Sequence, residues 1–166
     1  MKFRPKRSAR ENAAQVLPRL ANAFYRAGDA AYQDELHGEE LHDFRIRAKR
    51  FRYVLEYFRP CYGHAMDGYI EFVRNLQAAL GDLNDCCATR TLLPDLLPPG
   101  HAASFKRLFS ALDRREQELF EAYRTFWVSQ MQGPQDRSRF VRYLSHPPRR
   151  RPRTARARSR RAPRPK

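Results

Sequence analysis

The sequence predicts an all-α fold, a four-helix bundle followed by a basic tail that lies outside the bundle. Three observations lead to this prediction. Apolar side chains recur every three to four residues in four separate stretches, as they do along one face of a helix. Glycine and proline residues separate these stretches, and no stretch alternates convincingly as a β-strand would. The segment after Ser145 contains no aromatic or large aliphatic side chain that could build a core.

The composition fits one folded domain with an anionic partner. Of 166 residues, 42% are hydrophobic and 12% aromatic, which is enough to bury a core. The 33 basic residues outnumber the 18 acidic ones, and the net charge of +15 indicates a negatively charged ligand. Residues 147–166 hold ten basic and no acidic side chains. The remaining 23 basic and 18 acidic residues give only +5, so the placement of cations in the body matters more than the total.

The first predicted helix follows a basic arm, residues 1–7, which we expect to be frayed. The helix covers about residues 8–32. Ser8 and Glu11 have the spacing of a capping box, in which each side chain satisfies an exposed backbone N–H group. Pro18 falls inside this helix, where a proline removes a hydrogen bond and clashes with the preceding turn. We therefore expect a kink at Pro18 or a later start of the helix.

The second and third predicted helices are separated by a connection. The second covers about residues 39–58 and ends before Pro60, because proline disrupts a helix interior. Residues 61–68 connect it to the third helix, which covers residues 69–83 or more. We expect a bend in the third helix at Asn84, before a proline-rich loop.

The fourth predicted helix has the clearest periodicity. It ends at Gly133, and its apolar side chains recur at three- to four-residue intervals as Phe105, Leu108, Phe109, Leu112, Leu119, Phe120, Tyr123, Phe126 and Trp127. Four helices with short loops predict a bundle over residues 8–133. Residues 134–146 are interpreted as a connecting segment. Residues 147–166 are interpreted as a disordered Arg/Pro-rich tail.

The second helix carries a stripe of cations. At about 100° per residue, one arc of roughly 80° collects His42, Arg45, Lys49, Arg52 and Glu56. Apolar residues border this arc on both sides. Ile46, Tyr53 and Tyr57 lie on one flank, and the other consists of Phe44, Ala48, Phe51, Val54, Leu55 and Phe58. A solvated charged face normally lies opposite the apolar face. The stripe therefore indicates a groove inside or beside the bundle.

Phosphoryl oxygens fit such a stripe. Clustered cations repel one another, and a polyanion relieves the repulsion. Arginine offers forked donors to a phosphate, and lysine offers a point charge. Glu56 lies four residues after Arg52 and can hold that guanidinium in place. The alternative is that these are surface side chains that pair with Asp43 and other acids. The periodicity alone leaves both interpretations open.

The other helices add weaker candidates. On the third helix one polar strip contains Arg74, Gln77, Gly81, Asn84 and Asp85. Gly81 has no β-carbon and permits close helix packing or the approach of a ligand. For Gln77 and Asp85 we favour hydrogen bonds between helices. Arg74 is a candidate ligand-binding residue, as is Arg115 at the edge of the apolar face of the fourth helix.

Residues 41–58, LHDFRIRAKRFRYVLEYF, resemble the signature helix of the CHAD domain, the conserved histidine α-helical domain. Residues 76–85 resemble that family's LQ-x-x-LG-x-x-x-D element, and Phe126 and Trp127 also fit. The resemblance covers about residues 8–132. It implies a helical domain that binds inorganic polyphosphate through a basic cavity, with ligand-binding roles for His42, Arg45, Lys49 and Arg52.

The sequence departs from that family in one respect. It contains one histidine motif, whereas the family usually carries two four-helix halves, each with its own motif. The sequence therefore resembles one half of a CHAD domain. The cavity would be open, or a second copy would complete it. Exposed apolar flanks such as Ile46, Tyr53 and Tyr57 predict a weak homodimer that polyphosphate tightens.

Catalysis and metal binding find little support. Glu39 and His42 have the spacing of a di-metal ligand pair, but the sequence has no second Glu-x-x-His. No paired acid and base is evident, and no glycine-rich phosphate loop appears. We therefore expect a protein that is not an enzyme and has no metal or cofactor.

The remaining features concern location and the alternative ligand. Three cysteines without a CxxC spacing, no apolar leader and no long apolar run predict a reduced cytoplasmic setting without membrane insertion. The resemblance adds an association with polyphosphate granules. The main alternative function is nucleic-acid binding through residues 147–166, because arginine-rich segments bind phosphate backbones without reading sequence.

Overall fold

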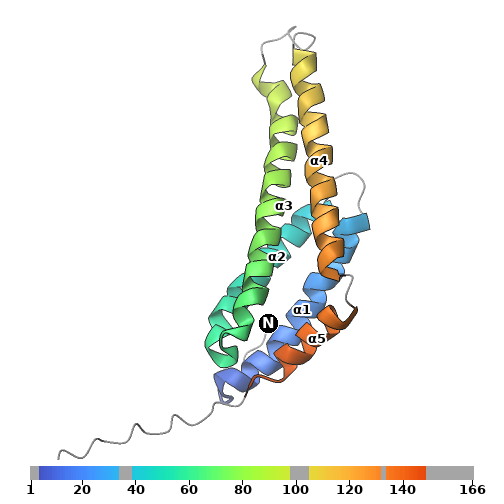
Figure 1. Ribbon diagram of the computed structural model, residues 1–166. Helices are drawn as coiled ribbons and strands as arrows, with labels where there is room; N and C mark the ends of the chain where they lie inside the picture. Colours follow the sequence, from blue (N-terminus) through green and yellow to red (C-terminus); the bar gives the residue numbers. More distant parts are fainter. Residues whose placement is uncertain (1–3, 34–38, 98–104, 132–133, 149–166) are drawn as a thin grey trace, which may run out of the picture.

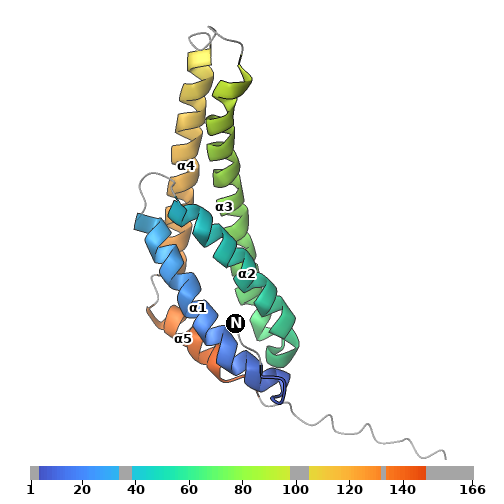
Figure 2. The same cartoon turned by 180° about the vertical axis from the view of Figure 1, so that it is seen from behind.

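The computed structural model describes residues 4–33, 39–97, 105–131 and 134–148. These ranges contain five helices and no strand, which confirms the all-α prediction. The helices are α1 (Ala9–Gln33), α2 (Glu39–Tyr62), α3 (Ala65–Leu96), α4 (Lys106–Met131) and α5 (Pro134–Ser145). In Figures 1 and 2, α1, α2 and α5 gather around the lower parts of α3 and α4. The other ends of α3 and α4 project beyond them as a helical hairpin.

Phe24 is the centre of the core. Its ring on α1 lies 4.9 Å from the ring of Phe51 and 5.4 Å from that of Phe44, both on α2. The indole of Trp127 on α4 lies 5.8 Å from Phe24 and 5.2 Å from Phe44. Aromatic pairs at such separations stabilise a core by about 0.5–1.5 kcal/mol each beyond the area they bury. These contacts hold α2 in a fixed rotation against α1 and α4.

The start of α1 follows the predicted capping box. The backbone N–H of Ser8 donates to Oε2 of Glu11 at 2.8 Å, and the N–H of Glu11 donates to Oγ of Ser8 at 3.3 Å. The helix then continues through Pro18 to Gln33 without interruption. The later start that we considered is therefore wrong. Pro18 removes a single backbone donor, and the buried face of α1 compensates for that loss.

Residues 4–7 form a turn that Asn12 fixes to α1, so the expected fraying of the arm is wrong over these residues. The Asn12 side chain is 8% exposed. Its Oδ1 accepts the N–H of Arg4 at 2.9 Å, and its Nδ2 lies 3.1 Å from the carbonyl oxygens of Arg4, Arg7 and Ser8. One buried amide thus binds backbone groups at both ends of the turn.

The predicted end of α2 is also wrong, because the helix passes Pro60 and reaches Tyr62. Tyr62 is 3% exposed, and its hydroxyl donates to the carbonyl of Leu144. Burial of this ring offsets the loss of the Pro60 donor. Gly63, at φ +75°, ends the helix in the left-handed region that glycine favours. The predicted connection shrinks to Gly63 and His64.

The third helix is one continuous segment of 32 residues, without an interruption at Asn84. Its last turns pair with the first turns of α4 in the projecting hairpin (Figure 1). There only one helix covers another, and Leu92, Leu96 and Leu108 are 58%, 77% and 43% exposed.

The predicted connecting segment is instead a fifth helix. In α5, Phe140 and Leu144 are fully buried. The ring of Phe140 stacks on Tyr69 of α3 with the centroids 3.8 Å apart. Pro134 is its first residue, where a missing N–H has no consequence. Except for Pro147 and Pro148, the predicted tail lies outside the described residues.

Candidate functional site

The rotation of α2 places the cation stripe on the outer surface, at the edge of the core. The neighbouring arc is buried, as predicted, through Phe44, Ala48, Phe51, Leu55 and Phe58. Arg45 and Arg52 are half-buried, whereas His42 and Lys49 are exposed. On the outer flank, Ile46, Tyr53 and Tyr57 are 36%, 49% and 73% exposed. Of the two predicted locations, the stripe therefore lies beside the bundle and not inside it.

Glu56 brings cations of two helices together. Its Oε1 lies 3.9 Å from Nε of Arg52 on α2 and 3.7 Å from Nη2 of Arg74 on α3. The predicted contact between Glu56 and Arg52 is therefore present. Glu71 also pairs with Arg74, with 2.7 Å between Oε2 and Nη1. These carboxylates balance the two arginines, so the excess positive charge of the site comes from Arg45 and Lys49.

Arg52 is the most constrained cation of the stripe. Its side chain is 23% exposed. Its guanidinium carbon lies 4.9 Å from the ring centroid of Tyr53. Its Nε is buried and has no hydrogen-bond partner in the described part of the chain, since Glu56 stops short of hydrogen-bond distance. A buried donor without an acceptor raises the free energy of the folded state. An anion that draws Arg52 outward would give this N–H group an acceptor and remove the penalty.

Arg115 lies away from this cluster. It is 60% exposed and pairs with Glu118 at 3.3 Å. Burial raises the pKa of Cys86 on α3, and the charge of Arg115 opposes part of that increase, so the two residues are near each other. Cys86 lies twelve residues beyond Arg74, or about 18 Å along α3 at 1.5 Å per residue. Of the two weaker candidates, the structure brings only Arg74 to the stripe.

The polar strip of α3 leaves open space. A β-carbon at Gly81 would meet no atom within 4 Å, so this glycine does not serve close helix packing. Of the two roles that the sequence predicts for Gly81, only the approach of a ligand remains. The Gln77 side chain makes no hydrogen bond in the ranges that the structure describes, and the Asp85 carboxylate there accepts only from its neighbour Asn84, at 3.4 Å. The hydrogen bonds that we favoured between helices are therefore not formed.

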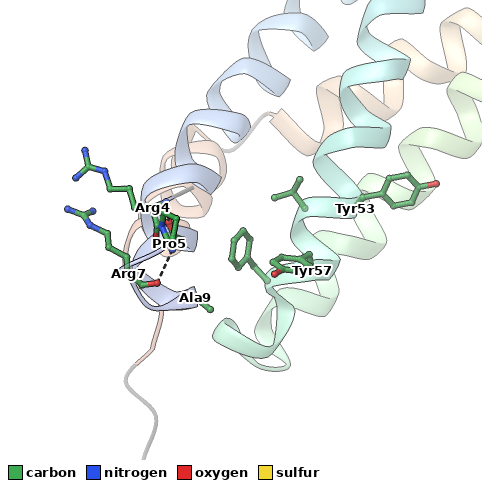
Figure 3. Close-up of a pocket in the computed structure, with 9 residues that line it drawn as sticks. Arg4, Pro5, Arg7, Ala9, Tyr53 and Tyr57 are labelled. Carbon is green, nitrogen blue, oxygen red and sulfur yellow. Dashed lines mark hydrogen bonds between the residues drawn. The ribbon is translucent and has the colours of Figure 1, made fainter. Parts of the chain in front are cut away.

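A cavity of about 530 Å³ adjoins the outer flank of α2 (Figure 3). It lies between α2 and the turn that precedes α1, and its lining consists of Arg4, Pro5, Arg7, Ala9, Asn12, Tyr53, Val54, Tyr57 and Phe58. Sequence reasoning missed this cavity because the arm was expected to fray. The signal that could have found it is Asn12, a polar residue on the apolar face of α1.

Two further findings concern what the described ranges lack. Within them, no helix is both long and apolar enough to cross a membrane. The same ranges contain no group of three or more histidine, cysteine, aspartate and glutamate side chains that could hold a metal ion.

Comparison with known proteins identifies one family. No curated protein and no solved structure gives a significant match to the chain. The sequence model of the CHAD domain, however, matches residues 2–94, which is more than half of the chain. The matched region holds the turn before α1, all of α1 and α2, and α3 as far as Pro94, so it includes the cation stripe and Arg74. The resemblance that we expected to extend to residue 132 is matched only to Pro94. On this match, the chain belongs to the CHAD domain family.

Proposed function

We propose that the protein binds inorganic polyphosphate on the outer face of α2, beside α3, and that it does so without catalysis. The family is associated with polyphosphate binding. The observation that carries the proposal is the row of cations at the edge of the core. His42, Arg45, Lys49 and Arg52 follow one another at three- and four-residue intervals, or about 4.5–6 Å of helix. A repeating anion fits a repeating row of cations.

The candidate residues would take different roles. The half-buried Arg45 and Arg52 present forked donors with restricted motion, which suits phosphoryl oxygens. Lys49 and His42 are exposed, and their side chains would contact the ligand from the solvent side of the stripe. Arg74 reaches the same anion from α3 when Glu56 releases it. Arg115 would take part only with a chain long enough to extend along α3.

A double substitution tests the site. Arg45→Ala with Arg52→Ala should weaken polyphosphate binding by at least about 100-fold, since hydrogen bonds to charged groups contribute about 1.5–3 kcal/mol each. Calorimetric titration of the full chain and of residues 1–148 measures the change, and circular dichroism confirms that helicity is unchanged.

The matched control is Arg47→Ala with Arg50→Ala. Both residues are exposed on the same helix outside the stripe, so the loss of charge is identical. This control should retain most of the affinity. If the two double variants weaken binding equally, the affinity depends on the net charge of the protein and not on the position of the cations in the stripe.

The charge of residues 147–166 favours a second candidate function. This segment holds ten basic side chains and no acidic one, and it could bind nucleic acid through phosphate contacts alone. Deletion of residues 149–166 would then abolish binding of duplex DNA and flatten its salt dependence, while polyphosphate binding persists. Under the first proposal the protein works in the cytoplasm, in association with polyphosphate granules. Granule association of a fluorescent fusion that the Arg45→Ala, Arg52→Ala pair abolishes is the expected result.

A further inference from the structure

The outer flank of α2 has a chemistry that a bare phosphate chain does not use. The cavity beside it is lined largely by apolar groups, among them Pro5, Val54 and Phe58. Tyr57 and Tyr53 also line it, and both rings remain exposed, at 73% and 49%. Polyphosphate has no apolar or aromatic part that could contact these surfaces. A ligand that fits the whole flank needs flat apolar groups as well as phosphates.

Tyr53 and Tyr57 each pack against a neighbouring side chain of α2. The ring of Tyr57 packs edge-on against Phe58, with 4.9 Å between centroids, and Phe58 is 2% exposed. The guanidinium carbon of Arg52 lies over the ring of Tyr53, 4.9 Å from the ring centroid. The two tyrosines lie one helical turn apart, or about 6 Å along α2. In Figure 3, Tyr57 lies on the side of α2 that faces the turn before α1, and Tyr53 extends in a different direction. They therefore offer two separate stacking positions along one helix.

Positive charge surrounds these positions. Arg52 and Lys49 lie on the same helix. Across the cavity, Asn12 fixes the backbone of Arg4 and Arg7. In Figure 3 the guanidinium groups of Arg4 and Arg7 point away from α2, so they add positive potential rather than direct contacts. Such a potential acts over about 8 Å at physiological ionic strength.

We propose that this flank binds single-stranded nucleic acid. One base would stack on Tyr57 at the cavity and a neighbouring base on Tyr53, with the connecting phosphates against Arg52 and Lys49. Aromatic stacking platforms combined with a cationic track are how proteins hold single strands without reading their sequence. The proposal goes beyond polyphosphate binding and does not depend on residues 147–166.

The decisive comparison uses the full chain and two strands of about 12 nucleotides, a length that a single-strand site covers. One strand is oligothymidylate, and the other is an abasic strand of the same length and charge. Any contact that the tail makes with phosphates is the same for both strands. We expect oligothymidylate to bind at least about tenfold more tightly in fluorescence anisotropy, because each stacked base contributes about 5- to 150-fold.

Substitutions locate the effect. Tyr57→Ala should remove most of the advantage of oligothymidylate over the abasic strand, whereas Tyr57→Phe should keep it. Leu96→Ala is the matched control, because it removes an equally exposed apolar side chain from α3. At protein concentrations too low for dimer formation, polyphosphate affinity should stay the same in all three variants.

Equal affinities of the wild-type chain for the two strands would overturn the inference. So would an advantage that survives Tyr57→Ala. These outcomes are separate from failure of the proposed polyphosphate site, which the arginine pair tests. If polyphosphate does not bind but the base-dependent advantage remains, the flank binds single strands alone.

Discussion

The indole of Trp127 lies directly against the backbone of Gly28. A β-carbon placed on Gly28 would be 2.1 Å from Cη2 of the indole, closer than any real contact. The hydroxyl of Tyr123, one turn earlier on α4, donates to the carbonyl oxygen of Gly28 at 3.2 Å. Helix α4 thus docks on α1 at the one position of this contact where the absence of a side chain leaves room for the indole.

Gly28→Ala should therefore destabilise the protein by about 1–3 kcal/mol, the usual penalty for an overpacked core. Alanine is otherwise the better helix former, by about 1 kcal/mol. Gly68→Ala in α3 is the matched control, because a β-carbon there meets nothing within 4 Å, and it should stabilise the fold. Urea unfolding measures both. Equal stability of the two variants would contradict the Gly28–Trp127 contact.

Cys87 should be a poor nucleophile. Burial raises the pKa of its thiol to about 12, and Glu116 adds to the increase, with 3.3 Å between Sγ and Oε1. Because the pKa is raised in the folded state, the protonated thiol favours the fold below about pH 9, and this contribution is lost as the pH rises toward 12.

Iodoacetamide at about pH 8 should therefore leave Cys87 unmodified in the folded protein, since the thiolate is the reacting species. The unfolded chain should be modified at all three cysteines, and Glu116→Gln should accelerate the reaction of folded Cys87. Rapid alkylation of Cys87 in the wild type would show that its thiol is not held protonated.

Asp67 should titrate far below an ordinary aspartate. Arg59 holds its pKa at about 2 through hydrogen bonds of 2.5 and 2.9 Å, and His64 contributes further. The lowered pKa means that this contact stabilises the fold above about pH 3.8, and the contribution disappears as the pH falls toward 2. Titration followed by NMR should give a midpoint near 2. Arg59→Gln should return it most of the way to 3.8, and an unchanged midpoint would exclude Arg59 as the cause.

Self-association remains a prediction for the exposed flank of α2. We propose a weak dimer through the face that contains Ile46, Tyr53 and Tyr57, which polyphosphate tightens by relieving repulsion between cations. Sedimentation velocity with and without polyphosphate measures it. Ile46→Glu should remove the dimer, and Leu96→Glu on the hairpin should not. A strictly monomeric chain at high concentration in both conditions would instead indicate a single open groove.

Most of the candidate site could be predicted from the sequence, because one helix carries it. Once apolar spacing fixes the buried face of α2, the helical period determines where Arg45, Lys49 and Arg52 lie. The Ser8–Glu11 cap and the Glu56–Arg52 contact are equally local. Arg115 could not be placed in the same way, because its distance from the stripe depends on how far α3 and α4 extend past α2.

Contacts between distant segments account for the errors. Helix α5 has few apolar residues, and burial of Phe140 against Tyr69, far away in sequence, stabilises it. Helix α2 continues past Pro60 because Tyr62 reaches the carbonyl of Leu144. Local propensity is a weak guide where such tertiary packing decides the outcome.

The position of α5 has a consequence for the order of synthesis. Helix α1 packs against α5, the last described helix. The ring centroids of Phe51 on α2 and Phe140 on α5 lie 6.2 Å apart. About 90 residues separate these two rings, or roughly 5–20 s of translation at about 5–20 residues per second. During that interval the cations of α2 are already part of the nascent chain, but the helix that completes the core does not yet exist. A polyanion could therefore meet this stripe before the fold that orders it is complete.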